Sequence, residues 1–328
     1  MHIGLTFDLR DEYRKLGYSE EATAEFDSVE TIDAIESAIQ KMGNTTERIG
    51  SIKRLAELLT QGKRWDMVFN IAEGLGGLAR EAQIPGLLEA FEQPYSFSPA
   101  EVMVVTLDKS LAKLKVNQAG IATAIWQIVA ESSDIKKINL PFPLFVKPIA
   151  EGTGKGISSK SLVENENELN LEVTELLTRF KQPVLVEKYL SGREFTVGII
   201  GSKENAKVIG VMEIIALSGA EKGGHTFHNK ENCETLMEYT VTNDSVSEAA
   251  GKLALDAWKA LDCLDAGRID IRCDANQVPH FLEVNPLPGL HPTHSDLPIL
   301  AGKNGMNYLT LMSEIVNAAT TRLKLNNL

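Results

Sequence analysis

Residues 267–289 read GRIDIRCDANQVPHFLEVNPLPG, and this stretch determines most of what the sequence predicts. Apolar and polar side chains alternate on both sides of its centre. Because successive side chains of a strand point to opposite faces, the alternation predicts two strands, each with one apolar and one polar face. The polar face would carry four residues: Arg268, Asp270, Glu283 and Asn285.

A four-residue loop at 275–278 would close these two strands into a hairpin. The register set by that loop contains four pairs: Arg268 with Asn285, Ile269 with Val284, Asp270 with Glu283, and Ile271 with Leu282. A slip of one residue would exchange the two faces of each strand. The apolar pattern therefore supports this register.

The pairing of Asp270 with Glu283 predicts a metal site. Two carboxylates that face each other repel, and such a pair destabilises an ordinary sheet. A divalent cation removes the repulsion, and carboxylates with an Asn carbonyl are hard oxygen ligands that suit magnesium. We expect the ligands to be Asp270, Glu283 and Asn285. A solvated polar face, on which Arg268 neutralises Asp270, is the alternative that this segment leaves open.

Size and composition narrow the class of protein. A chain of 328 residues is long enough for two or three packed units. A net charge of −12 argues against a nucleic-acid partner. No apolar run is long enough to cross a bilayer, and the first residues, MHIGLTFDLR, do not read as a signal peptide. Three scattered cysteines without a CxxC pair indicate free thiols. We expect a cytoplasmic protein with no membrane partner.

The first hundred residues alternate strand and helix signals. This alternation predicts a small parallel sheet of the βαβ type. The expected strands are His2–Asp8, Trp65–Ile71 and a short one at Tyr95–Phe97, and the expected helices are 28–42, Ser51–Thr60 and Pro85–Phe91.

The rest of the chain predicts mixed α and β structure. A helix Glu101–Gln118 would lead into the second unit, and a polar loop would run from Leu217 to Leu236. The final helix, Met306–Leu323, would bury Leu309, Met312, Ile315 and Val316. Further strands are expected at 144–149, 183–190, 194–201 and 207–215, and further helices at Glu164–Phe180 and Ser245–Leu261.

Two other segments point to a nucleotide. Lys147 ends an apolar strand in LFVKPIAEGTGKGI, and the glycines that follow do not open a long helix. They fit neither a dinucleotide fingerprint nor a P-loop, and we interpret them as a flap whose amides close over phosphates. In PVLVEKYLSGREFTVGIIG, Glu187 and Glu194 flank a turn beside apolar strands, which suits an adenine and a ribose. A plain hairpin turn and two surface glutamates are the alternatives.

Taken together these segments resemble the ATP-grasp superfamily, and within it the D-alanine–D-alanine ligase-like group. The resemblance covers nearly the whole chain and rests on the order of its landmarks: LDK at 107–109, VKP at 146–148, EGTGKG at 151–156, VEKYLSGREFTVGI at 186–199, GRID at 267–270 and FLEVNPLPG at 281–289. It implies an α/β chain, with α+β character in the ATP-binding part. An N-terminal pre-ATP-grasp domain would span 1–100, a central subdomain with the flap 101–185, and a C-terminal subdomain 186–328.

The resemblance also implies roles for individual residues. ATP phosphates would contact Lys109, Lys147 and the flap residues Glu151, Gly152, Thr153 and Gly154. Adenine and ribose would be held by Glu187, Lys188, Leu190, Glu194 and Leu282. Two Mg²⁺ ions, with Mn²⁺ as an alternative, would bind Asp270, Glu283 and Asn285. Arg268 and the Gly289 amide would stabilise the oxyanion of a tetrahedral intermediate.

The implied reaction joins a small-molecule carboxylate to an amine of an amino acid or peptide. The carboxylate attacks the γ-phosphate of ATP to give an acylphosphate, and the amine then displaces phosphate. The family resemblance further suggests a homodimer. Two alternatives stay open: a non-catalytic or regulatory ATP-binding protein of the same fold, and an authentic D-alanine–D-alanine ligase.

The sequence departs from the family pattern around the expected amino-acid substrates. After the first strand, the usual Ser-x-Glu element is missing from TFDLRDEYRKLG, and the usual HG-containing turn after the second strand is replaced by AEGLGG. The large loop has EKGGHTFHNK in place of a Lys-x-x-Tyr-like setting, and the short Ser-containing stretch after LPG is extended to LHPTHSDLP. We therefore expect a different substrate pair.

Histidine pairs at 225/228 and 291/294 have incomplete ligand sets for zinc. Residues His291, His294 or Ser295 are expected to bind the acceptor, with exposed loop histidines as the alternative.

Overall fold

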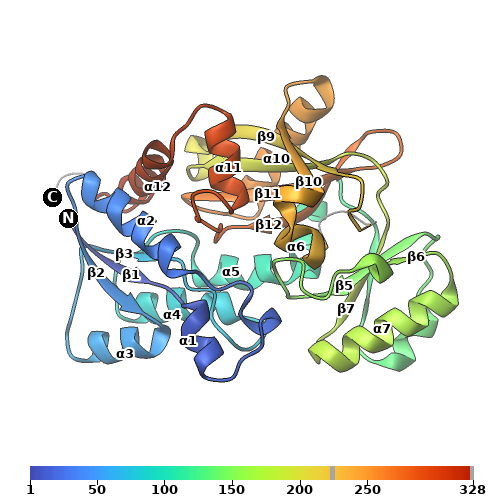
Figure 1. Ribbon diagram of the computed structural model, residues 1–328, viewed down its shortest axis with the longest axis horizontal. Helices are drawn as coiled ribbons and strands as arrows, with labels where there is room; N and C mark the ends of the chain where they lie inside the picture. The colour runs from blue at the N-terminus through green and yellow to red at the C-terminus, as the bar shows by residue number, and fades with distance from the viewer. Residues whose placement is uncertain (222–225, 326–328) are drawn as a thin grey trace.

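The computed structural model describes residues 1–221 and 226–325 and contains three sheets (Figure 1). Their strand orders are β2-β1-β3, β4-β7-β5-β6 and β10-β9-β8-β11-β12. Short 3-10 helices add η1 (Glu21–Thr23), η2 (Arg80–Ala82), η3 (Ser132–Lys137), η4 (Ser159–Ser161) and η5 (Lys203–Asn205). Within the described ranges, no helix is both long and apolar enough to span a membrane.

The N-terminal sheet is parallel, as predicted. Its strands are β1 (His2–Thr6), β2 (Thr45–Gly50) and β3 (Met67–Asn70), and its helices are α1 (Arg10–Lys15), α2 (Val29–Lys41), α3 (Ile52–Thr60) and α4 (Gln83–Ala90). The strand β2 was not predicted, because TTERIG is an edge segment with a single buried residue. The strand expected at Tyr95–Phe97 is wrong: Tyr95 forms only one bridge, to Val68.

The middle sheet is antiparallel and carries one long helix. Its strands are β4 (Trp126–Val129), β5 (Leu144–Pro148), β6 (Leu162–Val163) and β7 (Val184–Lys188), and the helix α7 (Glu166–Phe180) packs on it. The glycine-rich segment connects β5 to β6, as expected for a flap between strands. The strands β4 and β6 were not predicted because they are too short to show an alternating pattern.

The C-terminal sheet is also antiparallel. Its strands are β8 (Glu194–Ile200), β9 (Lys207–Ala216), β10 (Met237–Val241), β11 (Ala266–Cys273) and β12 (Pro279–Asn285). The helix α10 (Ser245–Ala260) packs on this sheet, as does α11 (Asp296–Lys303), and α12 (Tyr308–Arg322) packs against α11 and α2. Helices α10 and α11 approach the sheet at different residues: a Cβ at Gly251 of α10 would lie 3.2 Å from Val211, and one at Gly198 of β8 would lie 2.9 Å from Leu297 of α11.

The hairpin β11–β12 confirms three of the four predicted pairs, including Asp270 with Glu283. The fourth is wrong, because Ile271 pairs with Phe281 after a bulge. The predicted loop at 275–278 is also wrong by one residue, because Cys273 pairs with Pro279. Phe281 is fully buried and takes the core position, so Leu282 becomes the extra residue of β12. The bulge places Leu282 beside Glu283 on the wall of a cavity instead of in the core.

The helix predicted at Glu101–Gln118 is two helices, α5 (Ala100–Leu107) and α6 (Lys109–Gln118). Asp108 interrupts the predicted helix, because its backbone is extended. As the N-cap of α6, its carboxylate accepts hydrogen bonds from the Ser110 and Leu111 amides. As a result Lys109 and Lys113 both point into the protein and are buried.

Two further predictions are wrong in detail. Leu309 is 41% exposed, whereas Leu311 is fully buried, because Leu311 lies four residues before the buried Ile315 and so on the same face of α12. The expected polar loop from Leu217 to Leu236 contains α8 (Phe227–Glu231) and α9 (Cys233–Leu236). Four of its residues, 222–225, lie outside the described residues, and His225 is among them.

The buried clusters show how the sheets are held together. One cluster combines the N-terminal sheet, α2, α11 and α12, so the two ends of the chain share a core. A second joins α5, α6 and α10 to the C-terminal sheet, and a third holds the middle sheet with α7. The division at 100 and 185 stays a prediction, and the middle sheet itself extends to Lys188.

Candidate active site

Two adjoining hollows contain the predicted site residues. We call the first the inter-sheet cavity: it offers about 690 Å³ of space, part of it open to solvent, between β5 and β7 of one sheet and β11 and β12 of the other. We call the second the N-terminal cleft, of about 1720 Å³ measured in the same way. Glu151, Lys230 and Glu283 line both.

The structure brings the predicted residues together in two groups. Those lining the inter-sheet cavity are Lys147, Glu151, Gly154, Glu187, Lys188, Leu190, Glu194, Asp270, Leu282 and Glu283. Those lining the N-terminal cleft are Lys109, Glu151, Gly152, Thr153, Arg268, Glu283, Asn285, Gly289, His291, His294 and Ser295. Residues far apart in the sequence therefore meet along one continuous surface.

A buried ionic cluster lies beside the inter-sheet cavity. Glu187 Oε1 lies 2.9 Å from Lys147 Nζ, and Glu187 Oε2 lies 2.8 Å from Lys113 Nζ. Burial alone would raise the pKa of Glu187, but Lys113 and Lys147 lower it to about 2. Glu187 is therefore ionised and held between two ammonium groups. Lys113 was missed from the sequence, since a lone lysine on a helix is usually exposed.

The other wall of this cavity is aromatic and apolar. The Phe145 and Tyr189 rings stack with centroids 6.3 Å apart, and the Arg272 guanidinium lies 4.9 Å from the Tyr189 centroid. Arg272 also donates to Glu194 at 3.2 Å. A flat ring fits between such walls, and a ring-lined cavity with a few polar groups is typical of a nucleotide base site. Leu282 lines the same cavity because of the bulge.

The predicted metal ligands lie on β11 and β12. Thr196 donates to Asp270 Oδ1 at 2.8 Å, and Arg268 contacts the other oxygen. Burial alone would raise the pKa of Glu283, but Lys109, Lys147 and Lys230 lower it to about 2. Glu283 Oε2 lies 3.6 Å from Lys109 Nζ.

These residues fit a hard cation. The buried Asn285 Nδ2 has no hydrogen-bond partner among the described residues; this donor could bind a phosphate oxygen, whereas a cation would be bound by Oδ1. Over the same residues, no three His, Cys, Asp or Glu side chains gather as a metal site. A cation would be held by Asp270, Glu283 and the Asn285 Oδ1 atom, with the remaining ligands from water or phosphate, and this ligand set stays a prediction.

Arg268 and Gly289 face the N-terminal cleft. Arg268 contacts Asp270 and lies 3.6 Å from Asp296, and these acids raise its pKa although burial alone would lower it. A side chain at Gly289 would come within 2.8 Å of the Ser295 Oγ atom, so the glycine keeps this corner open. The lining of the cleft thus includes a permanent positive charge at Arg268 and a residue without a side chain at Gly289.

The histidines His291 and His294 also face the cleft. Their ring centroids lie 6.1 Å apart, and the His291 amide donates to Ser295 Oγ at 3.0 Å. Burial and the neighbouring His294 lower the pKa of His291. His291 is therefore uncharged near neutral pH, and its role as a substrate group stays a prediction.

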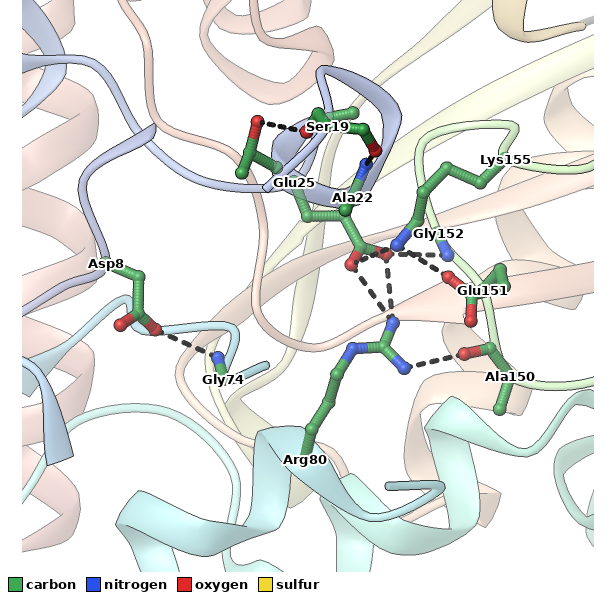
Figure 2. Close-up of polar contacts among 12 residues, drawn as sticks. Asp8, Ser19, Ala22, Glu25, Gly74, Arg80, Ala150, Glu151, Gly152 and Lys155 are labelled. Atoms are coloured by element: carbon green, nitrogen blue, oxygen red, sulfur yellow. Dashed lines mark hydrogen bonds and ion pairs between the residues drawn. The ribbon is translucent and has the colours of Figure 1, made fainter. Parts of the chain in front are cut away.

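The glycine-rich flap is tied to the N-terminal segment through Glu25 (Figure 2). Its carboxylate accepts from the Gly152 amide at 2.7 Å, from Lys155 Nζ at 2.9 Å and from Arg80 at 3.0 Å. Arg80 also donates to the Ala150 carbonyl at 2.7 Å. A side chain at Gly152 would collide with Glu25, which explains a glycine there.

We call Glu25, Arg80 and Lys155, with the Gly152 amide, the Glu25 hub, and its charged groups are buried. Glu25, Arg80 and Lys155 have side-chain exposures of 6%, 7% and 8%. Burial alone would raise the pKa of Glu25, but Arg80 and Lys155 lower it. No signal in the sequence connects residue 25 with residues 80 and 152, and the hub was not predicted.

Three more carboxylates line the N-terminal cleft: Asp27, Glu73 and Glu81. Burial raises the pKa of Asp27 and of Glu81 to about 7 each, and burial with repulsion from Glu81 raises that of Glu73 well above its usual value. Glu73 belongs to the AEGLGG turn that marked a departure from the family pattern. Raised pKa values mean that these carboxyls lack a cationic neighbour strong enough to offset their burial, and a positively charged group of a substrate would favour their ionised form.

The raised pKa of Asp27 predicts that the free energy of unfolding depends on pH. Its pKa rises from 3.8 to about 7 on folding, so between these values the native state binds more protons than the unfolded chain. Stability due to Asp27 is therefore lost as pH rises through this window. We expect Asp27→Asn to raise the free energy of unfolding by about 2 kcal/mol at pH 8 and by almost nothing at pH 4. Denaturant unfolding at both pH values checks this, and an equal gain at both contradicts it.

Lys230 is a further residue that was not predicted. It stands on α8 and lines both hollows, in the segment noted only for its departure from the family pattern. It lies near Glu283, whose pKa it helps to lower. Its position over the junction of the two hollows makes it a third lysine, after Lys109 and Lys147, that faces the region of the predicted phosphates.

Comparisons with known proteins agree with this geometry. Residues 116–317 match the family model described as the D-ala D-ala ligase C-terminus. The chain is 31% identical to a D-alanine–D-alanine ligase of Aquifex aeolicus over 88% of this chain and 94% of that protein. It is 30% identical to a D-alanine–D-alanine ligase of Bordetella petrii, over 83% of this chain and 80% of that one.

Solved structures show the same fold. A D-alanine–D-alanine ligase from Bacillus anthracis, complexed with ATP, matches with a TM-score of 0.74 at 23% identity over 99% of both chains. A D-Ala:D-Ser ligase from Enterococcus faecalis matches with a TM-score of 0.74 at 20% identity, over 97% of this chain and 99% of that one. The chain therefore has the ATP-grasp fold and belongs to the D-alanine–D-alanine ligase family of ATP-dependent carboxylate–amine ligases.

Proposed function

We propose that this chain binds ATP and Mg²⁺ at the junction of the two hollows and joins a carboxylate to the amine of an amino acid or peptide. The observation that carries the proposal is the meeting of Lys109, Lys147, Asp270 and Glu283 between an aromatic cavity and an acidic cleft. One hollow suits a base and ribose, and the other suits two small polar substrates. The phosphates would lie between them.

ATP would enter the inter-sheet cavity with its base between the Tyr189 wall and Leu282. The backbone of Lys188 and Leu190 would bind the adenine edge, and Glu194, oriented by Arg272, would accept from the ribose hydroxyls. Lys147 and Lys109 would contact the phosphates from opposite sides. The flap residues 151–154 would cover them.

Mg²⁺ would be held by Asp270, Glu283 and Asn285, where it would neutralise charge on the transferring phosphoryl group. Arg268 holds Asp270 in place and keeps its own positive charge toward the cleft. The same guanidinium, with the Gly289 amide, would stabilise the negative oxygen that forms when the amine attacks the acyl carbon.

The flap and its hub serve the second half of the reaction. An acylphosphate hydrolyses if water reaches it before the amine does. The contacts of Glu25 with Gly152 and Lys155 hold the flap against the N-terminal segment on the cleft side. We propose that this closure keeps water out until the amine attacks.

We propose a substrate pair other than two D-alanines. The raised pKa values of Asp27, Glu73 and Glu81 mean that these carboxyls lack a sufficient cationic partner, which a substrate could supply, and His291 and His294 stand near the expected acceptor end. These features favour amino acids or peptides with an additional cationic group. We also propose that the protein is cytoplasmic and forms a homodimer. Light scattering on the purified protein would test the dimer.

A substrate screen tests the proposal. The purified chain with ATP and Mg²⁺ is expected to release ADP and phosphate in equal amounts when the right pair of amino acids or dipeptides is added, and to release neither without Mg²⁺. Pairs containing Lys, Arg or ornithine should give the highest rates. Efficient synthesis of D-alanyl-D-alanine would contradict the different pair, and ATP binding without turnover for any pair would favour a regulatory protein.

A further inference from the structure

The ion cluster around Glu187 contains one more ammonium group than it has carboxylates. Lys113 and Lys147 each contact a different oxygen of Glu187, at 2.8 and 2.9 Å. Lys113 is fully buried, whereas Lys147 and Glu187 line the inter-sheet cavity. The cluster of these three side chains therefore carries a net positive charge, and Lys147 and Glu187 are the members that line the cavity.

Lys113 is held firmly in its place. Its ammonium donates to Thr123 Oγ1 at 2.7 Å and lies 5.5 Å from the Trp126 ring centroid. Trp126 on β4 is the direct neighbour of Glu187 on β7. Thr123 in turn donates to the Phe281 carbonyl at 2.8 Å, one residue before the bulge at Leu282. Lys113 thus connects the middle sheet to the strand that carries Glu283.

The charge count has a consequence for Lys147. Without Lys113, Glu187 and Lys147 would form a neutral buried pair, and a phosphate would compete with a desolvated carboxylate for the same ammonium group. With Lys113 present, Glu187 is already neutralised from the other side. An anion in the cavity then meets a positive charge that the carboxylate does not cancel.

We propose that Lys113 is a positioning residue for the nucleotide: it shares Glu187 with Lys147 and so leaves Lys147 free to bind a phosphate. This inference rests on the proposed function, because it requires ATP in the inter-sheet cavity. It assigns a role to a lysine that touches neither substrate, and it makes the effect of Lys113 depend on the charge of Glu187.

The test is a double-mutant cycle on the purified full chain, with Kd for MgATP measured by calorimetry and kcat measured in parallel. Lys113→Met is expected to weaken MgATP binding about 10- to 100-fold, with kcat changed only a few-fold. In the Glu187→Gln background, the same Lys113→Met change is expected to alter Kd less than about threefold, because no carboxylate then holds Lys147.

Several outcomes decide the question. Unchanged MgATP binding in Lys113→Met, or an equal loss from Lys113→Met in both backgrounds, would overturn the inference and leave Lys113 a structural residue. If Lys113→Met does not fold, a Kd change of more than about threefold between Glu187→Gln and the double variant would still overturn the inference. Failure of the parent chain to bind MgATP would overturn the proposed function instead.

Two further measurements separate charge sharing from simple packing. Lys115→Met on the same helix removes an exposed ion pair to Asp262 and should leave Kd unchanged. Burial lowers the pKa of Lys113, so MgATP binding by the parent should weaken at alkaline pH. Part of that alkaline loss should be absent from Lys113→Met, and an identical pH profile in both proteins would count against the inference.

Discussion

Glu283→Gln is expected to lower kcat by about a thousandfold and to raise the Mg²⁺ concentration needed for half-maximal activity. The change keeps the shape of the side chain and removes the charge that faces Asp270 across the hairpin. It also removes the counterion of Lys109, which lies 3.6 Å away. Steady-state rates of ADP formation over a range of Mg²⁺ concentrations measure both effects.

Glu238→Gln provides the matched control for this variant. Glu238 is an exposed glutamate on the edge strand β10 of the same sheet. Its replacement should leave both quantities unchanged. If Glu283→Gln retained more than about a tenth of the parent kcat with the same Mg²⁺ dependence, Glu283 would not be a metal ligand, and the polar face of the hairpin would be structural.

Glu25→Gln is expected to uncouple ATP consumption from ligation. Without the carboxylate, Arg80 and Lys155 stay buried with one counterion fewer, which should lower the free energy of unfolding by about 3 kcal/mol. The flap also loses a charged acceptor for the Gly152 amide. Water then reaches the acylphosphate, and phosphate release should exceed product formation several-fold.

The ratio of phosphate to ligated product, measured in one reaction mixture, reports this uncoupling directly. Glu21→Gln is the control, because Glu21 links the neighbouring η1 helix to Arg179 of α7 through an exposed ion pair. It should keep the ratio at one. A ratio of one in Glu25→Gln, at a temperature where the variant is folded, would show that the hub does not protect the intermediate.

The sequence predicted the chemistry of the C-terminal hairpin because its information is local. Alternation of side chains determines the faces of β11 and β12. The predicted pair of Asp270 with Glu283 is right because the bulge offsets a loop that is one residue longer than predicted. The sequence could not predict the bulge, since either Phe281 or Leu282 satisfies an apolar pattern. The choice depends on packing against the buried core, where Phe281 is fully enclosed.

The residues that were missed depend on contacts between distant segments. Glu25 meets Gly152 and Arg80 only after three parts of the chain have folded together. Lys113 is buried because Asp108 starts a new helix and turns it inward, whereas a continuous helix was expected.

The central claim is that ligation passes through an acylphosphate formed from ATP at the junction of the two hollows. Once the screen has found a substrate pair, a carboxylate substrate labelled with ¹⁸O in both oxygens tests it most directly. Mass spectrometry of the inorganic phosphate should show one ¹⁸O atom for each molecule of product, with ADP as the nucleotide released. Unlabelled phosphate, or release of AMP and diphosphate, would contradict the account.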